Sequence, residues 1–256
     1  MESKRILLTG ANGVVGSIIK KLLSDDHEIV ALGGSRDLDL TNADKVTEYF
    51  KSQDKFDVLI HCAAKGTEDT NSPDPSIMWT NLVMYENLKS NYRHFHRLLN
   101  LASGCELKPE SCRKESSLRE YLPKEPYGLS KNLIARDVLK HRDWYNLRLF
   151  GIATFTRVFK KVYEAAERGE KTFDLTDRYM DYLYEYQLEY ITRLYIETDA
   201  NLIKDVNMVP YEKHKVSDYV NGYISRMKLD IKLNIVGFND EPYNGDANNS
   251  KRLNVL

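Results

Sequence analysis

Apolar and polar residues follow one another along the first 150 residues in a pattern that predicts strands and helices in turn. Buried strands are indicated by short apolar runs at 5–8, 28–32, 56–61, 98–102 and 146–150. Apolar residues at helical spacing between these runs predict helices at 14–23, 42–52, 76–91 and 126–140. Such regular alternation favours a doubly wound α/β fold, in which helices cover both faces of a parallel sheet.

The pattern weakens after Gly151. Helices are predicted at 155–168, 185–197 and 215–227, extended chain at 173–184 and a short strand at 206–209. Loop composition marks 104–125, and also the tail at 242–256. We expect residues 1–151 to form the sheet domain and 152–256 mainly a small α/β substrate lobe, from which some segments could return to the main sheet.

A glycine-rich turn joins the first predicted strand to the first predicted helix. It runs Thr9-Gly10-Ala11-Asn12-Gly13-Val14-Val15-Gly16, and its glycines stand three residues apart. A strand, a glycine turn and a helix form the context of a Rossmann-type dinucleotide site. Gly10 would permit the tight turn, Gly13 would admit a pyrophosphate, and Gly16 would let helix and strand pack closely. The expected cofactor contacts are Gly10, Asn12, Gly13, Val14, Val15 and Gly16; the alternative is a tight turn that binds nothing.

The residues after the second predicted strand bear on which nicotinamide cofactor would bind. NAD sites usually have an acidic residue here, which accepts the ribose hydroxyls. Ser35 and Arg36 instead suit a 2′-phosphate, through a hydrogen bond and a planar cationic fork. Asp37 and Asp39 follow and weaken that argument. We expect NADP(H) to be favoured over NAD(H).

Tyr127 and Lys131 stand four residues apart near the start of a predicted helix, so their side chains share one face. A phenol has an ordinary pKa of about 10, and a neighbouring ammonium and nicotinamide favour its ionised form. Such a tyrosine can give a proton to a carbonyl oxygen as hydride reaches the carbon. An ordinary surface pair is the alternative. The glycine turn, together with Ser103 at the end of the intervening strand, favours the proton-donating role of Tyr127 over an ordinary surface pair.

Together these motifs resemble the extended short-chain dehydrogenase/reductases that act on nucleotide sugars, the NAD-dependent epimerase/dehydratase family. Within it, 36–41, 63–66, Asn81 and 103–105 are similar to GDP-L-fucose synthase-like 4-reductases. The resemblance implies that Ser103 holds the substrate carbonyl, Tyr127 is the acid/base, and Lys131 binds the nicotinamide ribose and tunes Tyr127. It also implies cofactor contacts at Asp39, Leu40, Ala63, Ala64 and Lys65, an ordering role for Asn81, and a diphosphate contact at Arg178.

Departures from the family narrow the expected reaction. The dehydratases carry an Asp-Glu pair directly after the catalytic Ser or Thr, whereas Gly104 and Cys105 follow here. Cys105 matches the cysteine that the family uses for epimerisation, but 152–159 contains no histidine to match its partner. The expected function is NADPH-dependent reduction of the C4 ketone of a nucleotide-activated 4-keto-6-deoxyhexose. An epimerase, a bifunctional epimerase–reductase and a catalytically idle NADP-binding regulatory protein stay open as alternatives.

Composition adds mostly exclusions to this picture. A net charge of −1 gives no electrostatic basis for nucleic-acid binding, and no apolar run approaches the roughly 20 residues of a membrane span. Cys62, Cys105 and Cys112 make no disulfide framework, which fits a reducing compartment. We expect a cytoplasmic protein that binds no metal. The family resemblance also implies a homodimer that pairs through 76–91 and 126–140.

Overall fold

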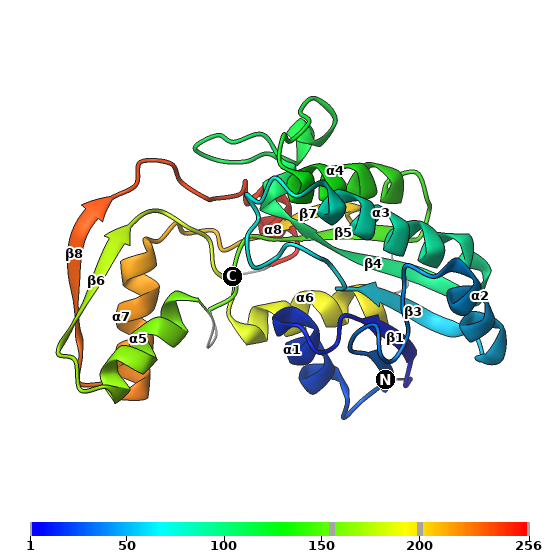
Figure 1. The fold of residues 1–256 in the computed structure, drawn as a ribbon, viewed down its shortest axis with the longest axis horizontal. Helices are drawn as coiled ribbons and strands as arrows, with labels where there is room; N and C mark the ends of the chain where they lie inside the picture. The colour runs from blue at the N-terminus through cyan, green and yellow to red at the C-terminus, as the bar shows by residue number, and fades with distance from the viewer. Residues whose placement is uncertain (1, 154–156, 199–201, 255–256) are drawn as a thin grey trace.

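A six-stranded parallel sheet, covered by helices on both faces, forms the larger part of the molecule, and a small lobe lies beside it (Figure 1). The computed structural model describes residues 2–153, 157–198 and 202–254. The sheet order is β2-β1-β3-β4-β5-β7, and every neighbouring pair is parallel. The strands are β1 (Arg5–Thr9), β2 (Glu28–Leu32), β3 (Phe56–His61), β4 (Phe95–Ser103), β5 (Trp144–Leu149) and β7 (Asp205–Met208). Strand order reverses between β1 and β3, the point at which such sheets bind ligands.

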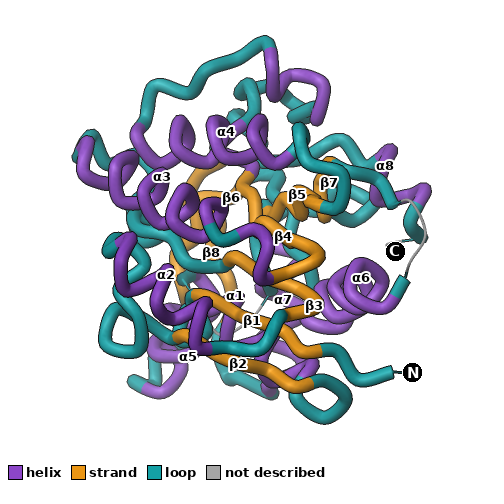
Figure 2. The backbone as a smooth tube through the Cα atoms, turned by 90° about the vertical axis from the view of Figure 1, so that its right-hand side faces the viewer, coloured by secondary structure: helices purple, strands orange, loops and turns teal. Residues whose placement is uncertain are grey.

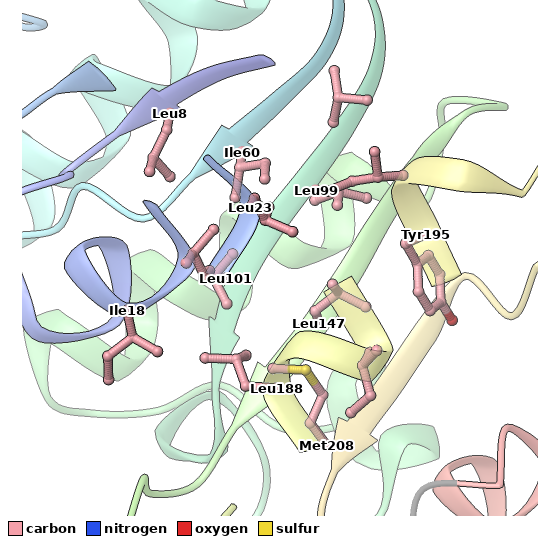
Figure 3. Packing of buried hydrophobic residues seen from close by; sticks show 14 of the residues in the cluster. Leu8, Ile18, Leu23, Ile60, Leu99, Leu101, Leu147, Leu188, Tyr195 and Met208 are labelled. Carbon is pink, nitrogen blue, oxygen red and sulfur yellow. The ribbon is translucent and has the colours of Figure 1, made fainter. Parts of the chain in front are cut away.

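Two layers of helices cover the sheet because most of its strand residues are apolar and buried on both faces (Figure 2). One layer consists of α1 (Val14–Leu23) and α6 (Glu185–Glu197), and the other of α2 (Ala43–Ser52), α3 (Pro75–Ser90) and α4 (Pro126–Val138). Figure 3 shows the first layer, where Ile18 of α1 and Leu188 of α6 pack in the same buried cluster as Leu101 of β4. These contacts fix the helix starts relative to the strand ends.

The lobe has its own hydrophobic core, distinct from those of the sheet. It consists of α5 (Val158–Glu167), β6 (Thr172–Asp177), α7 (Val216–Met227) and β8 (Lys232–Phe238). β6 and β8 form a two-stranded parallel sheet, and Phe159, Val162 and Val220 lie in the core that the two helices share. α6 and β7 fall between lobe segments in the sequence, yet α6 packs on α1 and β7 pairs with β5.

The predicted fold class is confirmed, and the differences lie in segments without strong periodicity. β8 was not predicted, because Ile235, Val236 and Phe238 on it are exposed and show no alternation. The predicted extended segment 173–184 is a regular strand only as far as Asp177.

Two segments expected to be loops contain short helices. Short 3₁₀ helices occur at Gly104–Glu106 and Glu115–Arg119 inside 104–125, and α8 (Asn248–Arg252) lies in the tail. α8 has no apolar face and is held on β7 instead, where the Ser250 hydroxyl donates to the carbonyl of Asn207. Phe155 and Thr156 of the predicted helix 155–168 lie outside the described residues. Among the helices described, none has the length and apolar character needed to cross a membrane.

Candidate active site

A cleft of about 1730 Å³ runs along the carboxyl ends of the strands and is bordered by the lobe. Residues from the ends of five neighbouring strands line it, namely Gly10, Gly33, Cys62, Ser103 and Phe150. Residues of the lobe and of the segments that join it to the sheet complete the wall, among them Arg178 and Tyr243. The cleft therefore occupies the position at which an open parallel sheet binds ligands.

The glycine turn forms one end of the cleft, and its geometry requires glycine. Gly10 has a φ of +70°, and a Cβ there would lie 2.6 Å from the Ala63 backbone nitrogen. A Cβ at Gly16 would lie 2.2 Å from the Gly10 carbonyl oxygen. Gly13 precedes α1 without a side-chain cap, so the first N–H groups of the helix are available to a ligand beside Val14 and Val15, which line the cleft. Bare backbone at a helix start fits a dinucleotide phosphate.

Two of the residues expected to hold the cofactor do not line this end of the cleft. Ser35, Asp39 and Leu40 line it, whereas Asn12 and Arg36 do not. Asn12 packs against the second strand end, since a Cβ at Gly33 would lie 2.2 Å from its Nδ2. The Asp39 carboxylate accepts hydrogen bonds from the Thr41 hydroxyl (2.7 Å) and backbone N–H (2.9 Å), and these bonds lower the pKa of Asp39.

Ser103 ends β4 and is held in a hydrogen-bonded turn. Its Oγ accepts from the Cys105 N–H at 3.3 Å, and its own N–H donates to Glu106 Oε2 at 3.3 Å. Glu106 is fully buried and receives a hydrogen bond from Arg148 Nε at 2.5 Å. Arg148 in turn donates to Asp205 on β7 at 2.7 Å. A buried ionic network of Glu106, Arg148 and Asp205 therefore holds the backbone of the serine in place.

Tyr127 and Lys131 lie on α4, which packs directly on this turn. A Cβ at Gly128 would lie 2.7 Å from the Cys105 carbonyl oxygen, so only glycine permits this approach. Burial raises the pKa of Tyr127 above its usual range, and the nearby Ser103 hydroxyl opposes that shift. Lys131 is also buried, its Nζ donates to the Leu101 carbonyl at 2.5 Å, and burial lowers its pKa. The structure thus brings the serine and the tyrosine together, with the lysine one helical turn further along.

The loop after β3 is tied to α4 by Asn81 of α3. Asn81 Oδ1 accepts from the Lys65 N–H at 2.8 Å, and Nδ2 donates to the Lys65 carbonyl and to Ser130 Oγ, both at 3.1 Å. Ala63, Ala64 and Lys65 all line the cleft. Asn81 therefore orders the loop that is expected to contact the cofactor.

The lobe side of the cleft contains Arg178 and also residues that sequence reasoning missed. Arg157 lines the cleft and donates across it from Nη2 to the Thr67 carbonyl at 2.6 Å. Tyr243 comes from the tail, and its hydroxyl lies 3.2 Å from Cys105 Sγ. No motif surrounds either residue, since both reach the cleft only through the folding of the lobe.

The arrangement suits transfer of a proton to or from a carbonyl oxygen. A protonated phenol near a serine hydroxyl can polarise a carbonyl and protonate it. Within the described part of the chain, no three or more His, Cys, Asp and Glu side chains are grouped to hold a metal ion. The hydride that a reduction needs would have to come from a bound dinucleotide, for which the glycine turn is suited.

Two curated proteins are similar to this chain in sequence. GDP-L-fucose synthase of Sinorhizobium fredii is 31% identical over 109 residues, which are 41% of this chain and 34% of that protein. GDP-L-colitose synthase of Yersinia pseudotuberculosis is 35% identical over 121 residues, 45% of this chain and 38% of that protein. The alignments thus span little more than a third of the length of these curated relatives.

A solved structure and a family model extend the likeness. The dTDP-4-dehydrorhamnose reductase of Bacillus anthracis, in complex with NADP, matches with a TM-score of 0.79 at 16% identity, covering 99% of this chain and 94% of that one. That match establishes the shared fold. Residues 6–164, from β1 into α5, match the model of the NAD dependent epimerase/dehydratase family. Since this match covers more than half of the sequence and includes the glycine turn, Ser103, Tyr127 and Lys131, the chain belongs to the NAD dependent epimerase/dehydratase family.

Proposed function

We propose that this protein uses NADPH to reduce the C4 ketone of a nucleotide-activated 4-keto-6-deoxyhexose. The observation that carries the proposal is the buried Tyr127 phenol, which lies near Ser103 in a cleft that begins at the glycine turn. The substrate class follows the relatives, which are named for the synthesis of GDP-L-fucose and GDP-L-colitose and for the reduction of dTDP-4-dehydrorhamnose.

The chain's own residues would guide the proton in this reaction. When bound, reduced nicotinamide supplies the hydride to C4. The Ser103 hydroxyl donates a hydrogen bond to the ketone oxygen and fixes it beside Tyr127. Tyr127 is protonated at neutral pH because burial raises its pKa, and it gives its proton to the same oxygen. Lys131 would bind the ribose hydroxyls, and its charge would stabilise the phenolate that remains.

Two arginines on the lobe side suit the diphosphate of the substrate. Arg178 follows β6 and Arg157 precedes α5, and both line the cleft. Burial raises the pKa of Tyr182, and the charges of both arginines oppose that shift, so each of them acts on this side of the cleft. Two guanidinium groups can bind a doubly charged diphosphate through paired hydrogen bonds. We assign the nucleotide end of the substrate to this side.

The preference for NADP(H) rests on the residues after β2. Ser35 lines the cleft, and Arg36 is exposed and makes no hydrogen bond or ion pair within the described residues. Arg36 is therefore free to turn toward a 2′-phosphate, which a guanidinium binds well. Asp39 would oppose the phosphate, so the balance between these two side chains sets the preference.

Turnover of GDP- and dTDP-linked 4-keto-6-deoxyhexoses, followed by loss of NADPH absorbance, tests the reaction. Tyr127→Phe should lower kcat on the order of 10²- to 10⁴-fold, because it removes the proton donor. NADPH binding should persist in that variant. Tyr186→Phe is the matched control, since Tyr186 on α6 is 63% exposed. Full activity in Tyr127→Phe would remove the assigned acid.

A bifunctional epimerase–reductase is the second candidate, favoured by Cys105, which lines the cleft beside Ser103. Turnover in deuterated water distinguishes the two, because epimerisation would introduce deuterium at C3 or C5 of the sugar. Reduction without such exchange would exclude epimerisation. Tight NADPH binding without turnover of any keto sugar would instead support a catalytically idle regulatory protein.

A further inference from the structure

Tyr243 places a second phenol in the catalytic cluster, on a segment that is far from it in sequence. Its hydroxyl lies 3.2 Å from Cys105 Sγ, and it is near enough to Ser103 for that hydroxyl to act on the pKa of the phenol. A Cβ at Gly104 would lie 2.9 Å from the same hydroxyl oxygen. Ser103 therefore influences two phenols, since it acts to lower the pKa of both Tyr127 and Tyr243 against the effect of burial.

The ring of Tyr243 is held between aromatic and cationic neighbours. Its centroid lies 5.2 Å from that of Phe150, and the Arg113 guanidinium carbon lies 4.7 Å from the ring centre. Arg113 also donates from Nη1 to the carbonyl of Gly104 at 3.0 Å. One arginine thus binds both the turn that carries Cys105 and the ring that approaches it.

The backbone around Tyr243 is fixed from the side of the lobe. Its N–H donates to the Tyr179 carbonyl at 2.9 Å, and its carbonyl accepts from the Asp181 N–H at 3.2 Å. Asp181 is almost fully buried, and its Oδ2 accepts from the Gly245 N–H and from Lys213 Nζ, both at 2.8 Å. A phenol held by so many contacts is preorganised, as a binding group must be.

We propose that the Tyr243 hydroxyl and the Cys105 thiol form a subsite for the hydroxyl group on C3 of the sugar, and so select 3-hydroxy over 3-deoxy substrates. The proposal rests on the proposed function, which assigns the C4 ketone to Ser103 and Tyr127. Of the two carbons next to C4, only C3 carries a hydroxyl, since C5 carries the methyl group and the ring oxygen. A polar pair directly beside the ketone site therefore suits C3.

The chemistry of the pair supports a role in binding. A thiol is a weak donor and a weak acceptor, so it satisfies the phenol poorly. Burial raises the pKa of Tyr243 well above its usual range, which keeps the phenol protonated and able to donate. A sugar hydroxyl would offer a better acceptor to Tyr243. A 3-deoxy sugar would leave the buried phenol with the thiol as its hydrogen-bond partner. Sites built for a hydroxyl reject analogues that lack one.

The test compares kcat/KM for a 4-keto-6-deoxyhexose and its 3-deoxy counterpart, both linked to the same nucleotide. The native protein should prefer the 3-hydroxy sugar by roughly tenfold or more. Tyr243→Phe should reduce this preference by about tenfold, mostly through a higher KM for the 3-hydroxy sugar. Tyr179→Phe, which changes a 40% exposed tyrosine of the same lobe, is the control and should keep the preference.

A second variant and a chemical readout separate binding from misfolding. Cys105→Ala should also lower the preference, and the double variant should lose less than the sum of the two single losses, because the groups act as a pair. Iodoacetamide labelling of Cys105, followed by mass spectrometry, should be slowed more by the 3-hydroxy nucleotide sugar than by the 3-deoxy one. NADPH binding checks that each variant is folded.

Distinct results would overturn the two proposals. Equal losses on both sugars in Tyr243→Phe, or a native preference for the 3-deoxy sugar, would overturn the subsite while the reductase remained. Failure of the native protein to reduce any 4-keto sugar would overturn the proposed function and the subsite with it.

Discussion

Burial sets the protonation state of the side chains around the strand ends. Tyr127 and Tyr243 have raised pKa values because they are removed from water, so both phenols can donate protons or hydrogen bonds at neutral pH. Lys131 and His61 have lowered pKa values for the same reason. The two phenols are thus held as neutral hydrogen-bond donors.

We expect the cofactor preference to depend on two residues after β2. Arg36→Ala should raise the KM for NADPH about tenfold and leave that for NADH nearly unchanged, because only the 2′-phosphate uses the guanidinium. Asp39→Asn should instead favour NADPH further, since it removes a negative charge that lines the cleft. Steady-state kinetics with both cofactors measures this. An equal effect of Arg36→Ala on both would contradict the assignment.

His61 should make the protein less stable in mild acid. It accepts or donates a hydrogen bond at 2.9 Å with the Thr9 hydroxyl, and burial, followed by the charge of Lys131, lowers its pKa to about 3. The unfolded chain binds a proton near the ordinary value of about 6.5. The contribution of neutral His61 to the free energy of unfolding should therefore be fully present above pH 6.5. It should fall by up to about 1.4 kcal/mol per pH unit as the pH drops toward 3.

Urea unfolding of His61→Gln at pH 7, 6 and 5 tests this dependence. The variant should be less stable at pH 7, but its stability should fall less steeply with acid than that of the native protein. His96→Gln is the control, because His96 is exposed at the start of β4 and should leave the slope unchanged. Parallel slopes in His61→Gln and the native protein would contradict the assignment.

At the scale of elements, the site is built by close contacts between α4, the end of β4 and the strands beyond it. The sequence predicted Ser103, Tyr127 and Lys131 because each belongs to a local motif on a periodic element. It did not predict Tyr243 or Arg157, because these residues reach the cleft through long-range packing of the lobe. β8 was not predicted either, because its apolar residues are exposed and do not alternate with polar ones.

The buried ionic network that joins the 104–106 turn to β5 and β7 should be essential for stability. Arg148→Met would leave the Glu106 and Asp205 carboxylates without their guanidinium, and Arg148 and Glu106 are fully buried. We expect a loss of about 3 to 5 kcal/mol in the free energy of unfolding. Lys171→Met, which breaks an exposed pair with Asp230, should cost far less, because solvent screens that pair. Urea denaturation compares the two variants, and similar losses would show that the network is dispensable.

At the scale of the whole molecule, α3 and α4 pack together and present apolar side chains to solvent. Trp79 on α3 is 64% exposed and Leu133 on α4 is 37% exposed. Exposed apolar residues on neighbouring helices are typical of an interface, and the family resemblance implies pairing through these helices. We propose that two copies of the chain associate there.

Trp79→Glu should convert this dimer to a monomer, because a charge at the centre of an apolar interface is costly to bury. Light scattering after size exclusion, at several protein concentrations, measures the mass. Tyr186→Glu is the control, since Tyr186 is equally exposed but lies on α6, on the other side of the sheet. A monomeric native protein would contradict the proposal.

The path of the chain between sheet and lobe has an evolutionary consequence. The chain enters the lobe after β5, returns after β6, enters again after β7 and returns after β8. No single cut separates the two bodies, so recombination at one point could not exchange the lobe for another. New substrate ranges in this architecture would arise by point substitution along the cleft wall, with the sheet inherited intact.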